Sequence, residues 1–271
     1  MKIGRRIFDT DNGAYIMGIL NVTPDSFSDG GKYNSEDKAL EHALSMIGDG
    51  ADLLDIGGES TRPGYEPVSA KEEQSRIVPV IRRIRSVSDI PISVDTTKAE
   101  VAKEALLAGA DMINDISCLT DPDMPGVIAD TGCAYCLMHN REIFEYADFR
   151  RDVLNDLKAA LKRLDEAGVN RAQIVIDPGV GFAKTIDQNL QVLKYIKDFH
   201  SFGLPVLLGT SRKSVIGKTL DLPVDERMVA TVATTVYGFE AGCSFFRVHD
   251  VKENRQALDM IRAIRNVKDE G

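Results

Sequence analysis

Short apolar runs alternate with longer segments of helical periodicity along the whole chain, and this alternation restricts the fold more than any other feature. Strands that are buried on both faces have such runs, because helices cover both faces of a parallel sheet. The chain therefore predicts eight parallel strands, over Tyr15–Leu20, Leu53–Ile56, Ile92–Val94, Met112–Ile113, Ala134–Met138, Gln173–Ile176, Val206–Leu208 and Phe245–Val248.

The segments between these runs carry apolar residues at helical spacing. Gly109, Gly168 and Gly242 stand where a glycine commonly ends a helix. Eight strand–helix units close into a barrel more naturally than they form an open sheet, so we expect an α/β fold, a (β/α)8 TIM barrel. The expected helices include Ser35–Asp49, Ala70–Arg85, Lys98–Leu107, Phe149–Ala167, Ile186–Phe202, Glu226–Ala241 and Val251–Val267.

The domain organisation is expected to be simple. A length of 271 residues is usual for one barrel, and no linker divides the chain. We therefore expect residues 1–271 to form a single domain. Lys2–Asp9 followed by Asp11-Asn12-Gly13 predicts a hairpin, since Asn-Gly suits a type I′ turn. We expect this N-terminal arm, residues 1–14, to cap the bottom of the barrel.

Composition excludes several classes of partner. The formal net charge is −9 and no Lys/Arg-rich run overrules it, so nucleic acid is not expected to bind. No apolar signal segment or membrane span is found, and we expect a cytoplasmic protein without a membrane partner. Cys133-Ala-Tyr-Cys136 lacks a second ligand pair and would point its thiols to opposite faces of a strand, which predicts buried structural thiols.

Polar residues gather where the apolar runs end. The carboxyl ends of barrel strands converge on one mouth, where the catalytic residues of this fold are found. A single Asp after a strand is commonly a helix cap. Asp250 is expected to be one, because Asp250-Val-Lys-Glu253 has the spacing of a capping box. Asp55 and Asp115 could be either structural residues or site residues. The polar strand-end set is Asn21, Asp95, Asn114, Asp115, His139, Asn140, Asp177, Lys213, Arg247 and His249.

Two subsites are expected within this set. Arg247 and His249 alternate on one strand beside a helix N-terminus, and Ser211-Arg212-Lys213-Ser214 adds cations and amides, which predicts an anion site. Two carboxylates and an amide can instead pair with the N–H groups of a planar heterocycle. This second subsite comprises Asp95, Asn114 and Asp177, with apolar neighbours Ile116, Met138 and Phe182.

Other chemistries are weaker explanations of the same residues. A metal triad is disfavoured because the chain has four His and no H-x-H or H-E-x-x-H spacing. A Schiff base on Lys213 would make an aldolase, but such a lysine is best desolvated on a strand, and Lys213 is expected in a loop beside Arg212.

The motifs resemble those of the dihydropteroate synthase family, pterin-binding enzymes of the folate pathway. The resemblance covers nearly the whole chain, and seven matching segments in order would not recur by chance. They are Met17-Gly-Ile-Leu-Asn-Val-Thr-Pro-Asp-Ser-Phe-Ser-Asp-Gly-Gly31, Asp55-Ile-Gly-Gly-Glu-Ser-Thr-Arg-Pro-Gly64, Ile92-Ser-Val-Asp-Thr-Thr-Lys98, Ile113-Asn-Asp115, Asp177-Pro-Gly-Val-Gly-Phe182, Ser211-Arg-Lys-Ser214 and Arg247-Val-His-Asp250.

The resemblance implies the condensation of 6-hydroxymethyl-7,8-dihydropterin diphosphate with p-aminobenzoate, giving 7,8-dihydropteroate and pyrophosphate with Mg2+. It implies that Asn21 helps to ligate magnesium and that Arg247 and His249 hold the diphosphate. The pterin residues would be Asp95, Asn114, Asp177 and Lys213. The loops Thr23–Asn34 and Gly57–Pro67 would form the p-aminobenzoate pocket, with Phe27, Thr61, Pro63 and Ser214, and with Asp29 and Arg62 nearby.

The chemistry is expected to be dissociative and SN1-like. The site supplies counter-charges for both fragments but no evident strong base to activate an arylamine. We expect Arg247 and Lys213 to act on the substrate, with Asp95 and Asp29 favouring the pterin cation.

A homodimer is expected, because Met228, Val229, Val232 and Val236 spread more widely around their helix than one core-facing stripe needs. The family implies the same. Two other functions stay open: a pterin-dependent methyltransferase barrel, which has no need of Asn21 or Ser211-Arg-Lys-Ser214, and a non-catalytic pterin-binding homologue, which would be expected to lose the anion site or the lids.

Overall fold

The parallel strands form one nearly closed barrel. The computed structural model describes residues 1–23, 31–59 and 67–267, and within these ranges eight parallel strands follow the order β8-β7-β6-β5-β4-β3-β10-β9. A bridge between Ile176 and Val206 joins the two ends of this order. The strands are β3 (Tyr15–Asn21), β4 (Leu53–Gly57), β5 (Ile92–Asp95), β6 (Met112–Asp115), β7 (Ala134–Met138), β8 (Ile174–Asp177), β9 (Leu207–Leu208) and β10 (Phe245–Val248).

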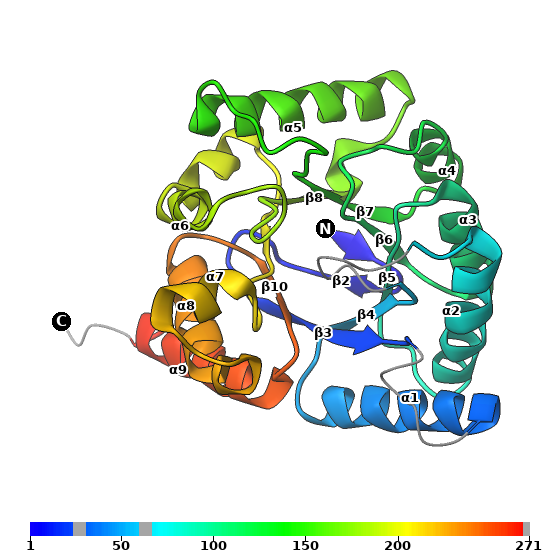
Figure 1. Ribbon diagram of the computed structural model, residues 1–271. Coiled ribbons are helices and arrows are strands. Elements are labelled where there is room, and N and C mark those ends of the chain that lie inside the picture. Colours follow the sequence, from blue (N-terminus) through cyan, green and yellow to red (C-terminus); the bar gives the residue numbers. More distant parts are fainter. Residues whose placement is uncertain (24–30, 60–66, 268–271) are drawn as a thin grey trace.

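Helices surround the strands in a ring (Figure 1). The predicted barrel is confirmed, because every predicted apolar run overlaps one of these strands. The helices are α1 (Gly31–Gly48), α2 (Ala70–Arg85), α3 (Ala99–Ala108), α4 (Met124–Thr131), α5 (Phe149–Glu166), α6 (Ile186–Lys194), α7 (Ser214–Leu220), α8 (Met228–Glu240) and α9 (Val251–Arg265), with 3-10 turns η2 (Arg171–Gln173), η3 (Ile196–Phe202) and η4 (Val224–Glu226).

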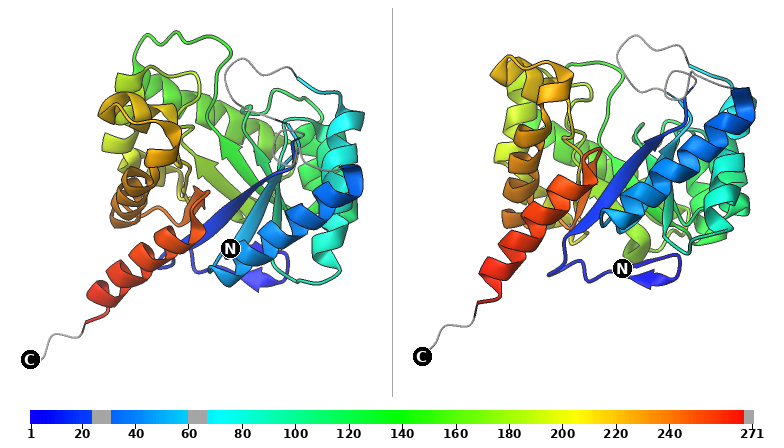
Figure 2. Two further views of the ribbon diagram at one scale, coloured as in Figure 1. Left: turned by 60° about the horizontal axis from the view of Figure 1, so that its bottom comes forward. Right: turned by 90° about the horizontal axis from the view of Figure 1, so that it is seen from below.

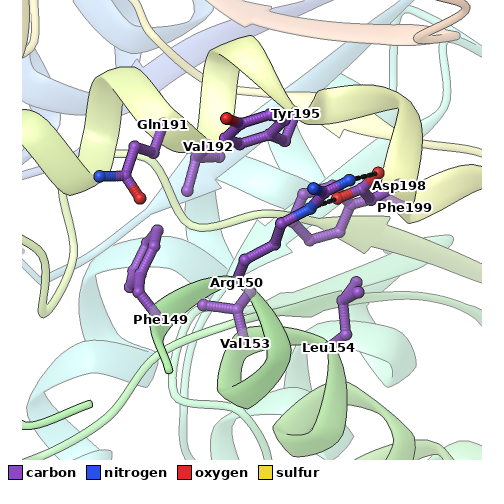
Figure 3. A pocket seen from close by; sticks show the side chains of 9 residues that line it. All are labelled: Phe149, Arg150, Val153, Leu154, Gln191, Val192, Tyr195, Asp198 and Phe199. Carbon is purple, nitrogen blue, oxygen red and sulfur yellow. Dashed lines mark hydrogen bonds and ion pairs between the residues drawn. The ribbon is translucent and has the colours of Figure 1, made fainter. Parts of the chain in front are cut away.

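Three helical details differ from the prediction. The short helices α4 and α7 were not predicted, since eight or fewer residues give little periodicity and α4 begins with Met124-Pro125-Gly126. The predicted helix Ile186–Phe202 divides at Tyr195 into α6 and η3. The side of η3 packs on α5, where Arg150 forms an ion pair with Asp198 over a groove of only about 20 Å3 (Figure 3).

The N-terminal arm is a hairpin at the amino end of the barrel, below the strands in Figure 2. It consists of β1 (Lys2–Ile3) and β2 (Arg6–Ile7), paired antiparallel. The prediction of the turn at Asn12-Gly13 was wrong, because the chain reverses at Gly4, whose φ is +57°. A Cβ at Gly4 would lie 2.5 Å from the Asp111 carboxylate, so the position also leaves no room for a side chain.

The hairpin closes the barrel interior as predicted. Ile3 and Phe8 are buried in one cluster with residues from β3, β4, β6, β7, β8, β9 and β10. The Phe8 ring meets the edge of Tyr15 at a centroid distance of 4.8 Å. Burying a phenylalanine contributes roughly 2–3 kcal/mol relative to leaving it exposed, so the arm fixes the bottom and leaves the other end for the site.

The two cysteines of the CxxC segment lie on opposite sides of the sheet, as the strand pattern predicted. Cys136 belongs to the cluster inside the barrel, whereas Cys133 packs against the outer core between strands and helices. Both thiols are free, and burial raises the pKa of each. Raised thiol pKa values disfavour the thiolate that redox chemistry or zinc binding requires.

Candidate active site

Four charged or amide side chains meet at the carboxyl end of the barrel because their strands pair in register. Asp95 lies beside Asn114 across β5 and β6, and Met138 lies beside Asp177 across β7 and β8. Asp95, Asn114 and Asp177 are all buried, and Asp55 is fully buried one strand away. The structure thus brings together the three residues that were predicted to face a heterocycle.

Arg247 of β10 is bound by two of these carboxylates. Its Nε donates to Asp55 at 2.6 Å and its Nη2 donates to Asp95 at 2.8 Å. Asn114 Nδ2 donates to the same oxygen of Asp55 at 3.0 Å. Asp55, whose role the sequence left open, is therefore part of the site, whereas Asp115 is structural and accepts from Ser117, Leu119 and Tyr135.

Electrostatics in this cluster follow from its burial. Desolvation raises the pKa of Asp95 to about 7, against the opposing effect of Arg247. Desolvation works to lower the pKa of Arg247, but Asp55 and Asp95 outweigh it and hold that pKa above its ordinary value. The arginine therefore stays charged, whereas Asp95 can change its charge near neutral pH.

Some buried polar atoms of the site have no partner among the described residues. They are Asp55 Oδ1, Asn114 Oδ1 and Ser93 Oγ. Leaving such an atom unsatisfied costs about 1–3 kcal/mol, and native proteins seldom retain one without a reason. The carboxylate and amide oxygens can only accept, whereas the hydroxyl can accept or donate, so the cluster suits a ligand that offers N–H donors.

Asp177 and Lys213 form the other side of the cluster. Asp177 accepts the Gly179 amide at 2.7 Å, and burial raises the pKa of this carboxyl. Gly209 lies between them: an added Cβ would be 3.7 Å from Asp177 Oδ2 and 3.8 Å from Lys213 Nζ. The glycine leaves open the space between an acceptor and a donor.

The Lys213 ammonium contacts the loop after β8. It donates to the Val180 carbonyl oxygen and lies 4.6 Å from the centroid of the Phe182 ring. Desolvation lowers the pKa of Lys213 to about 8, while Asp177 acts to raise it. Lys213 lies in a loop, as expected, directly before α7 begins at Ser214, yet burial desolvates it there, so a strand position is not needed for a desolvated lysine.

The expected anion corner is only partly assembled. His249 Nδ1 lies 3.0 Å from Ser211 Oγ, which also accepts the His249 amide, so the loops after β9 and β10 do meet. Arg212, however, turns away and forms an ion pair with Asp250. Asp250 is the N-cap residue of α9, as predicted, but its side chain makes no cap bond and pairs with Arg212 instead.

The remaining predicted residues have these places. Asn21 ends β3, and a Cβ on Gly57 would lie 3.8 Å from Asn21 Oδ1 and 4.0 Å from Asp95 Oδ2. Ile116 and Phe182 are partly buried, and Ser214 is exposed as the first residue of α7. Phe27, Asp29, Thr61, Arg62 and Pro63 lie outside the described residues.

His139 and Asn140, two polar residues at the end of β7, point away from the cluster. His139 Nε2 lies 3.0 Å from Asp156, and burial lowers the pKa of this imidazole to about 4. Asn140 donates to the Ile116 carbonyl at 2.9 Å and lines a cavity of about 530 Å3 between the loops after β6 and β7 and helix α5.

Sequence reasoning missed an ion-pair cluster at the root of the second loop. Lys98 forms ion pairs with Glu59 and with Glu73, the latter at 2.6 Å. Glu73 is buried, and burial raises the pKa of its carboxyl. Arg76 donates to the Gly58 carbonyl at 2.7 Å, so α2 and α3 together hold this part of the chain. Glu59 and Lys98 each lie within a quoted motif, but nothing in the sequence indicated that they pair.

Comparisons with known proteins agree on one family. A family model described as pterin binding enzyme matches residues 17–249. A dihydropteroate synthase of Clostridium beijerinckii is 53% identical over 262 residues, covering 96% of this chain and 97% of that protein.

Solved structures give the same result. A dihydropteroate synthase from Clostridium difficile, crystallised in the presence of pteroic acid, has a TM-score of 0.93 and 46% identity, covering 96% of this chain and all of that one (100%). The Xanthomonas albilineans dihydropteroate synthase in complex with 7,8-dihydropteroate has a TM-score of 0.90 and 38% identity, with coverages of 97% and 98%.

Proposed function

The chain belongs to the pterin-binding enzyme family, and from this membership we propose how its residues carry out the dihydropteroate synthase reaction. The enzyme is a transferase of folate biosynthesis. It condenses 6-hydroxymethyl-7,8-dihydropterin diphosphate with p-aminobenzoate, yielding 7,8-dihydropteroate and pyrophosphate.

The observation that carries the assignment of roles is the set of unsatisfied acceptors at the strand ends. A pterin ring presents amino and ring N–H groups in one plane, and Asn114 Oδ1 and Asp55 Oδ1 lack donors among the described residues. We place the pterin on Asp95, Asn114 and Asp177, with Lys213 donating to a ring acceptor. Ile116, Met138 and Phe182 supply the apolar edge of the same pocket.

The reaction requires the pterin methylene carbon to lose pyrophosphate. A dissociative path suits this pocket, because carboxylates surround the position where a pterin cation would form. Arg247 stays charged beside Asp95, and His249 lies with Ser211 at the corner where the diphosphate would leave. The roles of Asp29, and of Phe27, Thr61, Arg62, Pro63 and Ser214 at the p-aminobenzoate, remain predictions from the resemblance.

Magnesium is proposed as the cofactor, with Asn21 as its protein ligand. The donor set fits, since Asn21 Oδ1 and Asp95 Oδ2 both approach Gly57 and Mg2+ prefers oxygen ligands. Within the described ranges no cluster of three His, Cys, Asp or Glu is suited to a metal, but Mg2+ commonly binds through one or two protein oxygens together with phosphates and water. When bound, the ion would neutralise charge on the leaving diphosphate.

We also propose a homodimer that uses α8. Val229 is 72% exposed and Tyr237 is 50% exposed, and Met228, Val232 and Val236 are only partly buried. Exposed apolar stripes of this kind on a surface helix commonly mark an interface. Sedimentation as a dimer at micromolar concentration, converted to a monomer by Val229→Glu, would support it; a wild-type monomer would refute it.

The chain is proposed to work as one domain over residues 1–271 in the cytoplasm, which agrees with its four free thiols. Among the described helices, none combines the length and apolar character of a membrane span. The methyltransferase and non-catalytic alternatives are not favoured, because the relatives reported above carry the synthase name.

The direct test is an assay with Mg2+, dihydropterin diphosphate and p-aminobenzoate, following dihydropteroate and pyrophosphate. Product is expected from the wild type and should be lost in Asp95→Ala and Lys213→Ala. Pterin binding without product would favour a non-catalytic homologue. The absence of both pterin binding and product would refute the assignment.

A further inference from the structure

A second lysine, Lys184, lies buried behind the proposed pterin pocket, and its contact with the pocket residue Phe182 is made to the backbone carbonyl and not to the ring. Its side chain belongs to the loop between β8 and α6 and is only 7% exposed. Its Nζ donates to the carbonyl oxygens of Gly179 at 2.9 Å and Phe182 at 3.0 Å, and lies 2.9 Å from His139 Nδ1. The loop is thus wrapped around the side-chain nitrogen of its own penultimate residue.

The same loop carries the partners of Lys213. Val180 accepts from the Lys213 ammonium, and the Phe182 ring lies under it. A Cβ on Gly181 would lie 3.0 Å from Lys213 Cδ, so the backbone passes directly along the lysine stem. Any shift of this loop therefore moves the groups that place the Lys213 ammonium.

The loop is also fastened from its outer side. Tyr146 donates to the Ala183 carbonyl at 2.9 Å, and Asn189 accepts the Gly181 amide at 2.5 Å. A Cβ on Gly179 would lie 1.9 Å from the His139 carbonyl oxygen, so this residue has to be a glycine. The loop and the end of β7 are consequently packed without spare room.

His139 connects Lys184 to a charged pair. Burial lowers the pKa of His139 to about 4, so the ring is neutral near pH 7, and Nδ1 can accept from Lys184 while Nε2 donates to Asp156. Arg141 pairs with the same Asp156 oxygen at 2.6 Å. Burial lowers the pKa of Lys184 to about 7, while Asp177 acts to raise it, and carbonyl oxygens and an imidazole accept from its N–H groups.

We propose that Lys184 is a positioning residue for the synthase reaction, whose ammonium fixes the loop 178–183 and thereby sets the place of Lys213 in the pterin pocket. This inference rests on the proposed function. A lysine that only stabilised the fold would affect unfolding without distinguishing between the two substrates. Lys184, as a positioning residue, acts on the pterin side of the reaction alone.

The test replaces the ammonium with an apolar chain of similar length, in Lys184→Met, in the full-length protein. The value of kcat/KM for dihydropterin diphosphate is expected to fall by about tenfold or more, because small misplacements at a site are costly. The KM for p-aminobenzoate should stay at the wild-type value. Lys162→Met is the matched control, since Lys162 is exposed on α5 and forms a surface ion pair with Glu166.

A second variant covers the case in which Lys184→Met does not fold. Lys184→Gln keeps two N–H donors for the Gly179 and Phe182 carbonyls, and is expected to show a pterin KM between those of the wild type and Lys184→Met. Pteroic acid binding provides a readout that does not need turnover, and its affinity should fall in the same order.

Two results separate the inference from the function on which it rests. If the wild type makes dihydropteroate while both Lys184 variants keep its pterin KM and pteroic acid affinity, the inference is wrong and the function stands. An equal rise of both substrate KM values would also overturn it, because that pattern indicates general loosening. If the wild type neither makes product nor binds pteroic acid, the function and the inference fail together.

Discussion

The guanidinium of Arg247 lies 2.8 Å from the carboxylate of Asp95, and the same group also donates to Asp55. One cation thus pairs with two buried carboxylates from neighbouring strands. Removing it leaves both charges unpaired, which costs several kcal/mol at buried positions. The cluster therefore contributes to folding as well as to the proposed chemistry.

Arg247→Met is expected to lower the free energy of unfolding by about 3 kcal/mol and to abolish activity. Urea unfolding monitored by circular dichroism measures the first effect. The control is Arg5→Met, because Arg5 and Asp89 are 83% and 73% exposed and such pairs contribute little. Equal stability of Arg247→Met and the control would contradict a shared counter-ion.

The pH dependence of the reaction should be bell-shaped. Below about pH 7 Asp95 takes up a proton and no longer stabilises a pterin cation, and above about pH 8 Lys213 loses its charge. The value of kcat/KM for the pterin substrate is thus expected to fall on both sides of this interval. Asp95→Asn should remove the acid limb of the profile, and Lys213→Met should remove the alkaline limb. If a limb is unchanged in its variant, a different group causes it.

Gly209 is predicted to shape the pterin pocket. A methyl group there would make ordinary contacts with Asp177, Lys213 and Arg247, so the fold should tolerate Gly209→Ala, but the methyl would occupy ligand space. We expect the pterin KM to rise roughly tenfold at unchanged stability. Gly48→Ala is the control, since among the described residues no atom outside its own helix backbone and chain neighbours lies within 4 Å of its added Cβ. A wild-type KM in Gly209→Ala would place the pterin elsewhere.

The dissociative path predicts that bond cleavage does not wait for p-aminobenzoate. In a single turnover with Mg2+ and dihydropterin diphosphate alone, pyrophosphate should be released and the cation trapped by water or an added nucleophile. The carboxylates around the pterin position provide the physical reason. Pyrophosphate release that begins only after p-aminobenzoate is added would contradict this order.

Much of the fold could be predicted from the sequence, because buried parallel strands have their own apolar signature. The barrel mouth followed from a general rule of the fold, which correctly brought Asp95, Asn114 and Asp177 together. The turn of the N-terminal hairpin was misplaced, since Gly4 and Asn12-Gly13 both suit a turn and only the packing of Ile3 and Phe8 chooses between them.

The choice of partner by each charged residue could not be predicted. Arg212 was expected to face an anion but forms an ion pair with Asp250. The Asp250 carboxylate therefore makes no cap bond at the start of α9. Lys184 carries no local signal, since its nearby acceptors are backbone carbonyls of Gly179 and Phe182, which any residue offers, and its imidazole partner lies 45 residues away in sequence. Such pairings depend on side-chain geometry across the barrel, which periodicity does not contain.

The central claim is that the buried acceptors at the strand ends hold the pterin. Asn114→Leu tests it most directly, by calorimetric titration with pteroic acid, because it removes an oxygen that lacks a donor among the described residues and retains similar volume. The affinity is predicted to fall by about tenfold or more, while Asn155→Leu, an exposed site on α5, should leave it unchanged. Wild-type affinity in a folded Asn114→Leu protein would contradict the account.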